Sequence, residues 1–77
     1  MSGTSIPHYR ERAGLTQAKL AESIGVDIPT MSKIENAIQV PTADQVDKIS
    51  EKLGTIPTVL WTKAMLALVA ERARAAS

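Results

Sequence analysis

The 77-residue sequence contains no cysteine and no phenylalanine, and only 3% of its residues are aromatic. Without cysteine the chain has neither a disulfide framework nor thiolate ligands for a metal ion. Its longest apolar run, residues 64–70, is too short to cross a bilayer, which takes about 20 residues. The N-terminus also lacks the basic and apolar segments of a secretory signal. These absences predict one small cytoplasmic domain with no metal, no cofactor and no membrane segment.

The sequence also has almost no excess of one charge, since nine Lys and Arg oppose eight Asp and Glu for a net charge of +1. A nucleic-acid-binding domain usually carries a clear basic surplus, so composition by itself does not indicate one. An enzyme is disfavoured as well, because the chain has one histidine, no paired carboxylates and little volume for a substrate cleft. We therefore expect no enzymatic activity, and any function has to be inferred from motifs.

What the sequence does contain is a regular succession of helix start and stop signals. The strongest lie in residues 16–36, TQAKLAESIGVDIPTMSKIEN. Thr16 and Asp27 are favourable N-cap residues. Pro29 suits a first helical turn, and Gly25 suits the left-handed residue at a helix end. Because apolar residues recur at spacings of three and four on both sides of the glycine, the stretch predicts a helix-turn-helix.

Taken in order, these residues resemble the phage-repressor/Cro (XRE-like) class of helix-turn-helix DNA-binding domains. The resemblance covers about residues 5–54, and its most specific motifs are Leu15-Thr16-Gln17, Leu20-Ala21, Gly25-Val26, Ser32 and Ile34-Glu35-Asn36. It implies an all-α, lambda-repressor-like fold of five helices that binds double-stranded DNA. By size the chain is most similar to restriction–modification controller proteins and small phage repressors, which implies an autoregulating repressor or controller.

Helix signals before and after the motif predict the first and fourth helices. Ser5 can cap a helix that runs to about residue 13 and is stopped by Gly14. The residues before Ser5 are expected to form a frayed tail. Thr42 and Gln45 make a capping box that opens the fourth helix, and Gly54 ends it.

A long fifth helix is predicted from residue 55 or 58 to about residue 74. Its apolar residues cover more than the stripe of about 100° that packing on one neighbour requires. We expect the excess to form a homodimer interface; the alternative is over-coverage of a small core by a long helix. The residues assigned to the interface are Val59, Leu60, Trp61, Met65 and Leu68. Residues 1–54 are thus the predicted DNA-binding core, and residues 55–77 a dimerisation helix of the same domain.

In the family that the chain resembles, the third helix enters the major groove, which is about 12 Å wide and admits one α-helix. The matching outward positions are Ile28, Pro29, Thr30 and Lys33, with Ser32 as a supplementary contact. Lys33 can donate to guanine O6 or N7, and the apolar pair before Thr30 can pack on a thymine methyl group. The alternatives are that Ile28 lies in the core, that Pro29 only starts the helix, and that Lys33 is a solvated lysine.

The start of the second helix is expected to bind the DNA backbone, because its free amides and positive dipole end attract phosphate. The Thr16 hydroxyl lies beside these amides. The resemblance implies phosphate contacts from Gln17 and Asn36, and Lys19 and Gln39 are added because they lie nearby. The alternative for Gln17 is an exposed helix-forming residue.

Two further positions follow from the resemblance. It implies an ion pair between Arg10 of the first helix and Glu35 of the third, with two independent surface charges as the alternative. The residue after Asn36 is commonly glycine in this class, but here it is Ala37. A left-handed alanine costs about 1 kcal/mol, so the sequence leaves the form of this turn open.

Two classes of function fit these observations. The first is a homodimeric transcriptional regulator that inserts its third helix into both half-sites of a palindromic operator, about 34 Å apart. The second is a protein-interaction module, such as an antitoxin, that binds a partner through the apolar C-terminal helix; the low net charge favours it. No small-molecule ligand is expected, because the chain leaves no room for a sensing domain.

Overall fold

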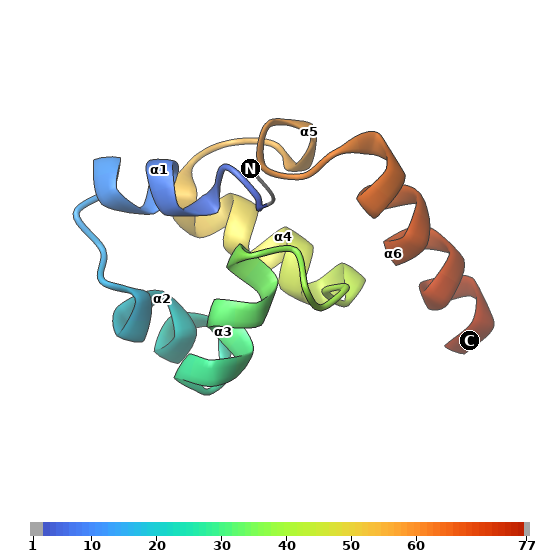
Figure 1. Ribbon diagram of the computed structural model, residues 1–77, viewed down its shortest axis with the longest axis horizontal. Coiled ribbons are helices and arrows are strands. Elements are labelled where there is room, and N and C mark those ends of the chain that lie inside the picture. The colour runs from blue at the N-terminus through green and yellow to red at the C-terminus, as the bar shows by residue number, and fades with distance from the viewer. Residues whose placement is uncertain (1–2, 77) are drawn as a thin grey trace.

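The computed structural model describes residues 3–76, and among them it contains α-helices and no strand (Figure 1). The helices are α1 (Ile6–Arg12), α2 (Gln17–Ile24), α3 (Ile28–Glu35), α4 (Ala43–Leu53), α5 (Pro57–Leu60) and α6 (Lys63–Ala76). The predicted all-α fold is thereby confirmed. In Figure 1, α2 and α3 lie below α1 and α4, and α6 lies at the opposite end of the molecule from α2.

The helix-turn-helix forms where its local signals predict it. Thr16 Oγ1 accepts from the Lys19 amide at 3.1 Å and begins α2. Gly25 ends α2 in the left-handed region at φ 80°. Asp27 Oδ1 then accepts from the Thr30 amide at 2.9 Å and begins α3. Since each helix has its own cap, the angle between α2 and α3 is set within a turn of three residues.

One apolar cluster joins α2, α3 and α4 to α1 and α5. Its fully buried side chains are Ile6, Leu20, Met31, Ile34, Ile49 and Leu60. Each such Leu, Ile or Met stabilises the folded chain by about 1.5–3 kcal/mol relative to an exposed position. The inward face of α3 is part of this cluster, and the helix is therefore held firmly while its other face stays in solvent.

The segment before α1 is bound to the rest of the fold, and the predicted frayed tail is wrong for Thr4. Its backbone amide and its hydroxyl both donate to the carbonyl oxygen of Glu35, at 3.0 and 2.9 Å. The Ile6 amide donates to Thr4 Oγ1 at 3.1 Å, whereas the Ser5 side chain makes no capping bond. Thr4 thus replaces Ser5 as the capping side chain, because it also satisfies a free carbonyl at the end of α3. Residues 1 and 2 of the predicted tail lie outside the described residues.

The predicted fifth helix is divided in two, so the described chain has six helices instead of five. After α5, Trp61 adopts an extended conformation with φ −121° and ψ 156°. Thr62 Oγ1 then accepts from the Met65 amide at 3.1 Å at the start of α6. Leu60 and Trp61 are only 2% and 4% exposed. The helix breaks here because the chain must turn to place both side chains in the core of the subunit.

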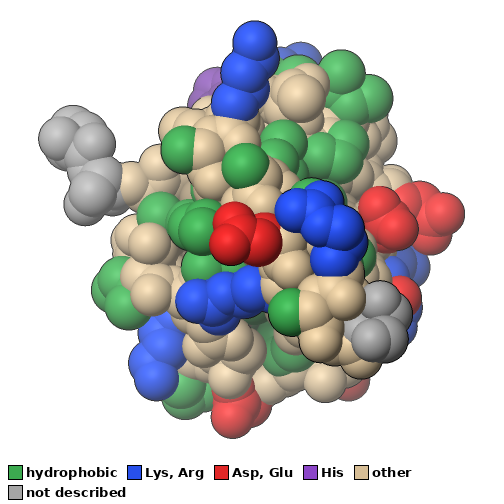
Figure 2. All heavy atoms as spheres, turned by 90° about the vertical axis from the view of Figure 1, so that its right-hand side faces the viewer, with side chains coloured by type: hydrophobic (Ala, Val, Ile, Leu, Met, Phe, Trp, Pro, Cys, Tyr) green, Lys and Arg blue, Asp and Glu red, His purple; other side chains and the backbone are tan. Residues whose placement is uncertain are grey.

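Helix α6 packs loosely on the rest of the domain. Val69 is its one buried side chain, Met65 and Leu66 are half-buried, and Leu68 is 43% exposed. Figure 2 looks onto the end of the molecule where α6 runs and shows charged side chains scattered among apolar ones. No helix within residues 3–76 is both long and apolar enough to cross a membrane.

The turn after α3 contains the single non-glycine residue with positive φ among the described residues, Ala37 at φ 58°. This conformation lets the amides of Ile38 and Gln39 donate to the carbonyl of Lys33, at 2.9 and 3.3 Å. A left-handed L-residue costs about 1–2 kcal/mol. The chain therefore keeps the left-handed helix end that glycine would favour, and alanine adopts it with strain.

Candidate nucleic-acid interface

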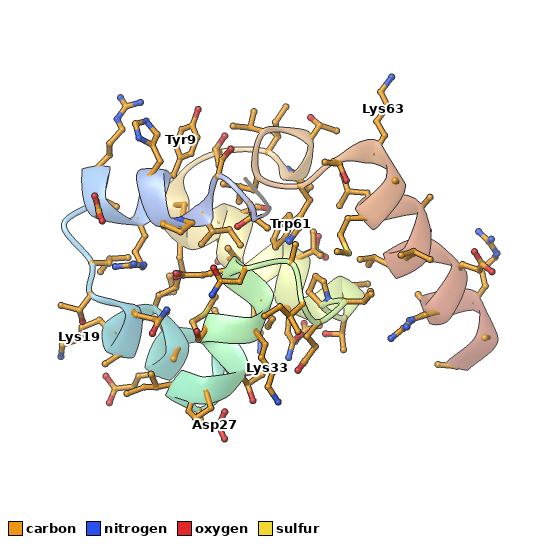
Figure 3. The ribbon with its side chains drawn as sticks, in the orientation of Figure 1. Tyr9, Lys19, Asp27, Lys33, Trp61 and Lys63 are labelled. Atoms are coloured by element: carbon orange, nitrogen blue, oxygen red, sulfur yellow. The ribbon has the colours of Figure 1, made fainter. Side chains whose placement is uncertain are left out.

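Residues that the sequence assigns to base contacts lie on the solvent side of α3. Ile28 is 49% exposed, so it does not pack in the core. Pro29 and Lys33 are exposed, while Thr30 and Ser32 are half-buried. Figure 3 shows Lys33 on the lower edge of the molecule, the edge formed by α2 and α3. One face of α3 is thus exposed to solvent, while Met31 and Ile34 anchor the opposite face.

A network around Glu35 holds the first three helices together. Arg10 Nε donates to Glu35 Oε2 at 2.8 Å, and Arg10 Nη1 donates to the Leu15 carbonyl at 3.0 Å. The Arg10 and Glu35 side chains are 14% and 4% exposed, so water screens this pair weakly. The implied ion pair is present in this geometry, and it links α1 to the end of α3.

Gln17 is the third member of this network. Its Nε2 donates to Glu35 Oε1 at 3.1 Å, so both carboxylate oxygens have a donor. A glutamine amide has a second N–H, and this donor remains for a phosphate, which only accepts hydrogen bonds. The sequence predicts a phosphate contact for Gln17, but it does not predict the bond to Glu35. The local sequence carries no signal for this bond, since it joins residues 18 positions apart.

The residues assigned to phosphate contacts fall into two groups. Thr16 and Lys19 lie with Gln17 at the start of α2, where the Thr16 hydroxyl already serves as the helix cap. Lys19 approaches Glu22 at 3.9 Å, but both side chains are exposed, and such a pair contributes little. Asn36 and Gln39 follow α3, and Asn36 Nδ2 donates to the Ser32 carbonyl at 2.9 Å. The fold thus places one group at the start of α2 and the other directly after α3.

Asp27 adds a negative charge to the same edge of the molecule. Hydrogen bonds lower the pKa of its carboxyl group below the ordinary value, first from the Thr30 side chain and then from the Thr30 amide. The positive charge of Lys33 lowers it further by a smaller amount. The carboxylate therefore stays ionised at neutral pH. Sequence reasoning identified Asp27 as a cap and assigned it no contact with DNA.

The described residues contain no cluster of side chains suited to a metal ion. Among residues 3–76, no group of three or more His, Cys, Asp or Glu side chains is arranged to hold a metal ion. The polar side chains of the α2–α3 edge are hydrogen-bond donors and acceptors of the kinds that contact phosphates and base edges.

A helix-turn-helix family model matches residues 8–61, which extend from α1 through α5. The chain therefore belongs to this XRE-type helix-turn-helix family of DNA-binding transcriptional regulators, whose members are typically not enzymes. The match includes the buried Leu60 and Trp61 and leaves α6 outside.

Two curated relatives support the assignment. They are the uncharacterized HTH-type transcriptional regulators MT0491 and Rv0474 of Mycobacterium tuberculosis, from strains CDC 1551 / Oshkosh and ATCC 25618 / H37Rv. Each is 34% identical to this chain over 62 residues, which is 80% of the chain. The chain spans 44% of the length of these relatives, which is less than half.

Proposed function

We propose that this chain is a homodimeric transcriptional repressor that binds a palindromic operator, with α3 in the major groove of each half-site. The observation that carries the proposal is the two-sided character of α3. Met31 and Ile34 are fully buried, while Ile28 is half-exposed and Lys33 is exposed on the other side. Insertion into the groove requires a helix whose one face is packed against the domain and whose other face is exposed to solvent.

Base recognition is assigned to the exposed side of α3. Lys33 would donate to guanine O6 or N7, and Ile28 with Pro29 would pack on a thymine methyl group. Thr30 and Ser32 would add hydroxyl contacts. Each good base contact contributes about 1–3 kcal/mol of discrimination against the wrong base.

Binding to the DNA backbone is assigned to residues at both ends of the helix-turn-helix. Thr16, Gln17 and Lys19 would contact phosphates from the start of α2, where the helix dipole favours negative charge. Asn36 and Gln39 would do so from the end of α3. Because Gln17 bonds to Glu35 at the end of α3, the two groups lie near the same end of the base-contacting helix, and phosphate contacts from them would fix its register on the duplex.

The dimer interface is assigned to α6 and the exposed part of α5. Leu60 and Trp61 leave the assignment, because both side chains are buried within the subunit. Val59 and Leu68, at 37% and 43% exposure, and the half-buried Met65 remain. In the proposed dimer, a two-fold axis beside α6 would set both α3 edges on the same side.

A protein partner is the second candidate function, and the same exposed side chains favour it. Leu68 lies on a helix that buries little of its surface, and the net charge of +1 gives DNA no strong long-range attraction. In this case α6 would bind a different chain, such as the toxin of a toxin–antitoxin pair. A stable homodimer in isolation would contradict this candidate.

The test is a titration of the protein against its own upstream DNA and a scrambled duplex at several salt concentrations. We expect preference for the upstream fragment, with log K falling linearly in log salt. Lys33→Ala should weaken the preferred site about tenfold and random DNA much less, whereas Lys52→Ala on α4 is the matched control. Weak and equal binding to both duplexes would overturn the proposal.

A further inference from the structure

Asp27 stands where α3 begins, in front of the residues assigned to base contacts. Its side chain is exposed, and its Oδ1 accepts from the Thr30 amide at 2.9 Å. In Figure 3, Asp27 and Lys33 both lie along the lower edge of the molecule, away from the body of the domain. If α3 enters a major groove, this carboxylate enters it too, since the N-terminal end of the recognition helix contacts the base edges.

A carboxylate in the major groove has few partners. Ionised, it only accepts hydrogen bonds, and it has about four acceptor positions, of which the Thr30 bonds use only part. Phosphates repel it. Adenine offers an amino group beside the N7 acceptor, whereas cytosine offers its N4 amino group with no acceptor of its own at the groove edge. Cytosine is therefore the base that a carboxylate suits best.

We propose that Asp27 is a specificity-determining residue, whose carboxylate accepts a hydrogen bond from cytosine N4 in each half-site and weakens binding to non-cognate DNA. The inference rests on the proposed function. Opposite guanine or thymine, the charge would lose water without gaining a donor, which is costly, and opposite adenine it would face the N7 acceptor beside the amino group. Asp27 thus complements Lys33, because one reads a cytosine and the other a guanine at different positions of the half-site.

A capping role alone is the competing explanation, and two substitutions separate it from base recognition. Serine and asparagine are about as good as aspartate at an N-cap, so Asp27→Ser and Asp27→Asn keep the cap and remove the charge. Asparagine suits adenine, to which it bonds N6 and N7 together. Glu51→Gln removes one charge from an exposed position on α4 and serves as the matched control.

The experiment selects bound duplexes from a library with randomised half-sites, for the natural protein and the three variants. The natural protein should require cytosine at one position. Asp27→Ser should reduce that preference about tenfold and bind random duplex several-fold more tightly, and Asp27→Asn should shift the preference toward adenine. Glu51→Gln should retain the natural profile. Thermal unfolding of each variant shows that it is folded.

The outcomes distinguish this inference from the proposed function. If the natural protein enriches no sequence, the proposed function itself is overturned. If it enriches a sequence and both Asp27 variants enrich the same one with unchanged strength, only the role of Asp27 is overturned. If the Asp27 variants instead lose a preference for a base other than cytosine, the assignment of cytosine is contradicted.

Discussion

Gln17 Nε2 donates to Glu35 Oε1 at 3.1 Å, while Arg10 donates to the other oxygen of the same carboxylate at 2.8 Å. One buried side chain thereby connects α1, the start of α2 and the end of α3. The start of α2 and the outer face of α3 are the two parts assigned to DNA. Their relative position consequently depends on Glu35, although this side chain is only 4% exposed and cannot itself contact a ligand.

Removing one partner of this network should be costlier than removing two. Arg10→Met leaves the Glu35 carboxylate buried with Gln17 as its remaining donor, and we expect a loss of about 3 kcal/mol in the free energy of unfolding. Adding Glu35→Met should recover part of that loss, because no unpaired charge is left. Urea denaturation of both single variants and the double variant measures this. Losses that simply add would contradict the coupling.

The strained turn after α3 offers a stabilising substitution. Ala37→Gly should raise the free energy of unfolding by about 1 kcal/mol, since glycine adopts φ near 58° without the steric cost of a Cβ atom. Ala67→Gly, at an exposed position within α6, is the control and should lower it by about 1 kcal/mol. Thermal unfolding compares the two. A loss at both positions would show that Ala37 is not strained.

Trp61 and Leu68 should respond in opposite ways to truncation. Trp61→Ala opens a cavity in the subunit core and should cost about 3–5 kcal/mol of stability. Leu68→Ala should change subunit stability by less than about 0.5 kcal/mol but lower the dimer fraction in sedimentation. Equal dimer fractions for Leu68→Ala and the natural protein would remove Leu68 from the interface.

Asp27 predicts a pH dependence of stability with a defined sign. Its pKa is lowered in the folded chain, so the carboxylate stabilises the fold above the ordinary value of 3.8. That contribution is lost as the pH falls through the lower, folded pKa. The stability of the natural protein relative to Asp27→Asn should therefore decline below about pH 4 and stay constant between about pH 5 and 7. Denaturant midpoints across this range provide the measurement.

Local signals were sufficient to predict α2, α3 and α4. Thr16, Asp27 and Thr42 each cap the helix that follows, and Gly25 and Gly54 end α2 and α4, because these effects act within a few residues. The exposure of Ile28, left open by the sequence, needed the packed structure, since periodicity in a helix of eight residues does not separate core from surface at its first position.

The errors of the sequence analysis involve contacts between distant residues. Apolar residues continue from α5 into α6, so nothing in the periodicity indicates that Trp61 leaves the helix to become buried. The hydrogen bond from Thr4 to the carbonyl of Glu35 joins residues 31 positions apart in the sequence. The bond from Gln17 to the Glu35 side chain joins residues 18 positions apart. Such bonds depend on the tertiary fold, which capping and periodicity rules do not describe.

Helix α6 buries a single side chain, Val69, although it is the longest helix of the described chain. Its amides should therefore exchange with deuterium well before those of α2 and α4, because opening it exposes little apolar surface. The domain would then consist of a rigid part, α1–α5, and a C-terminal helix, α6, that opens without unfolding the rest. Substitutions on α6 would change the assembly proposed for this helix, while the residues assigned to DNA keep their positions.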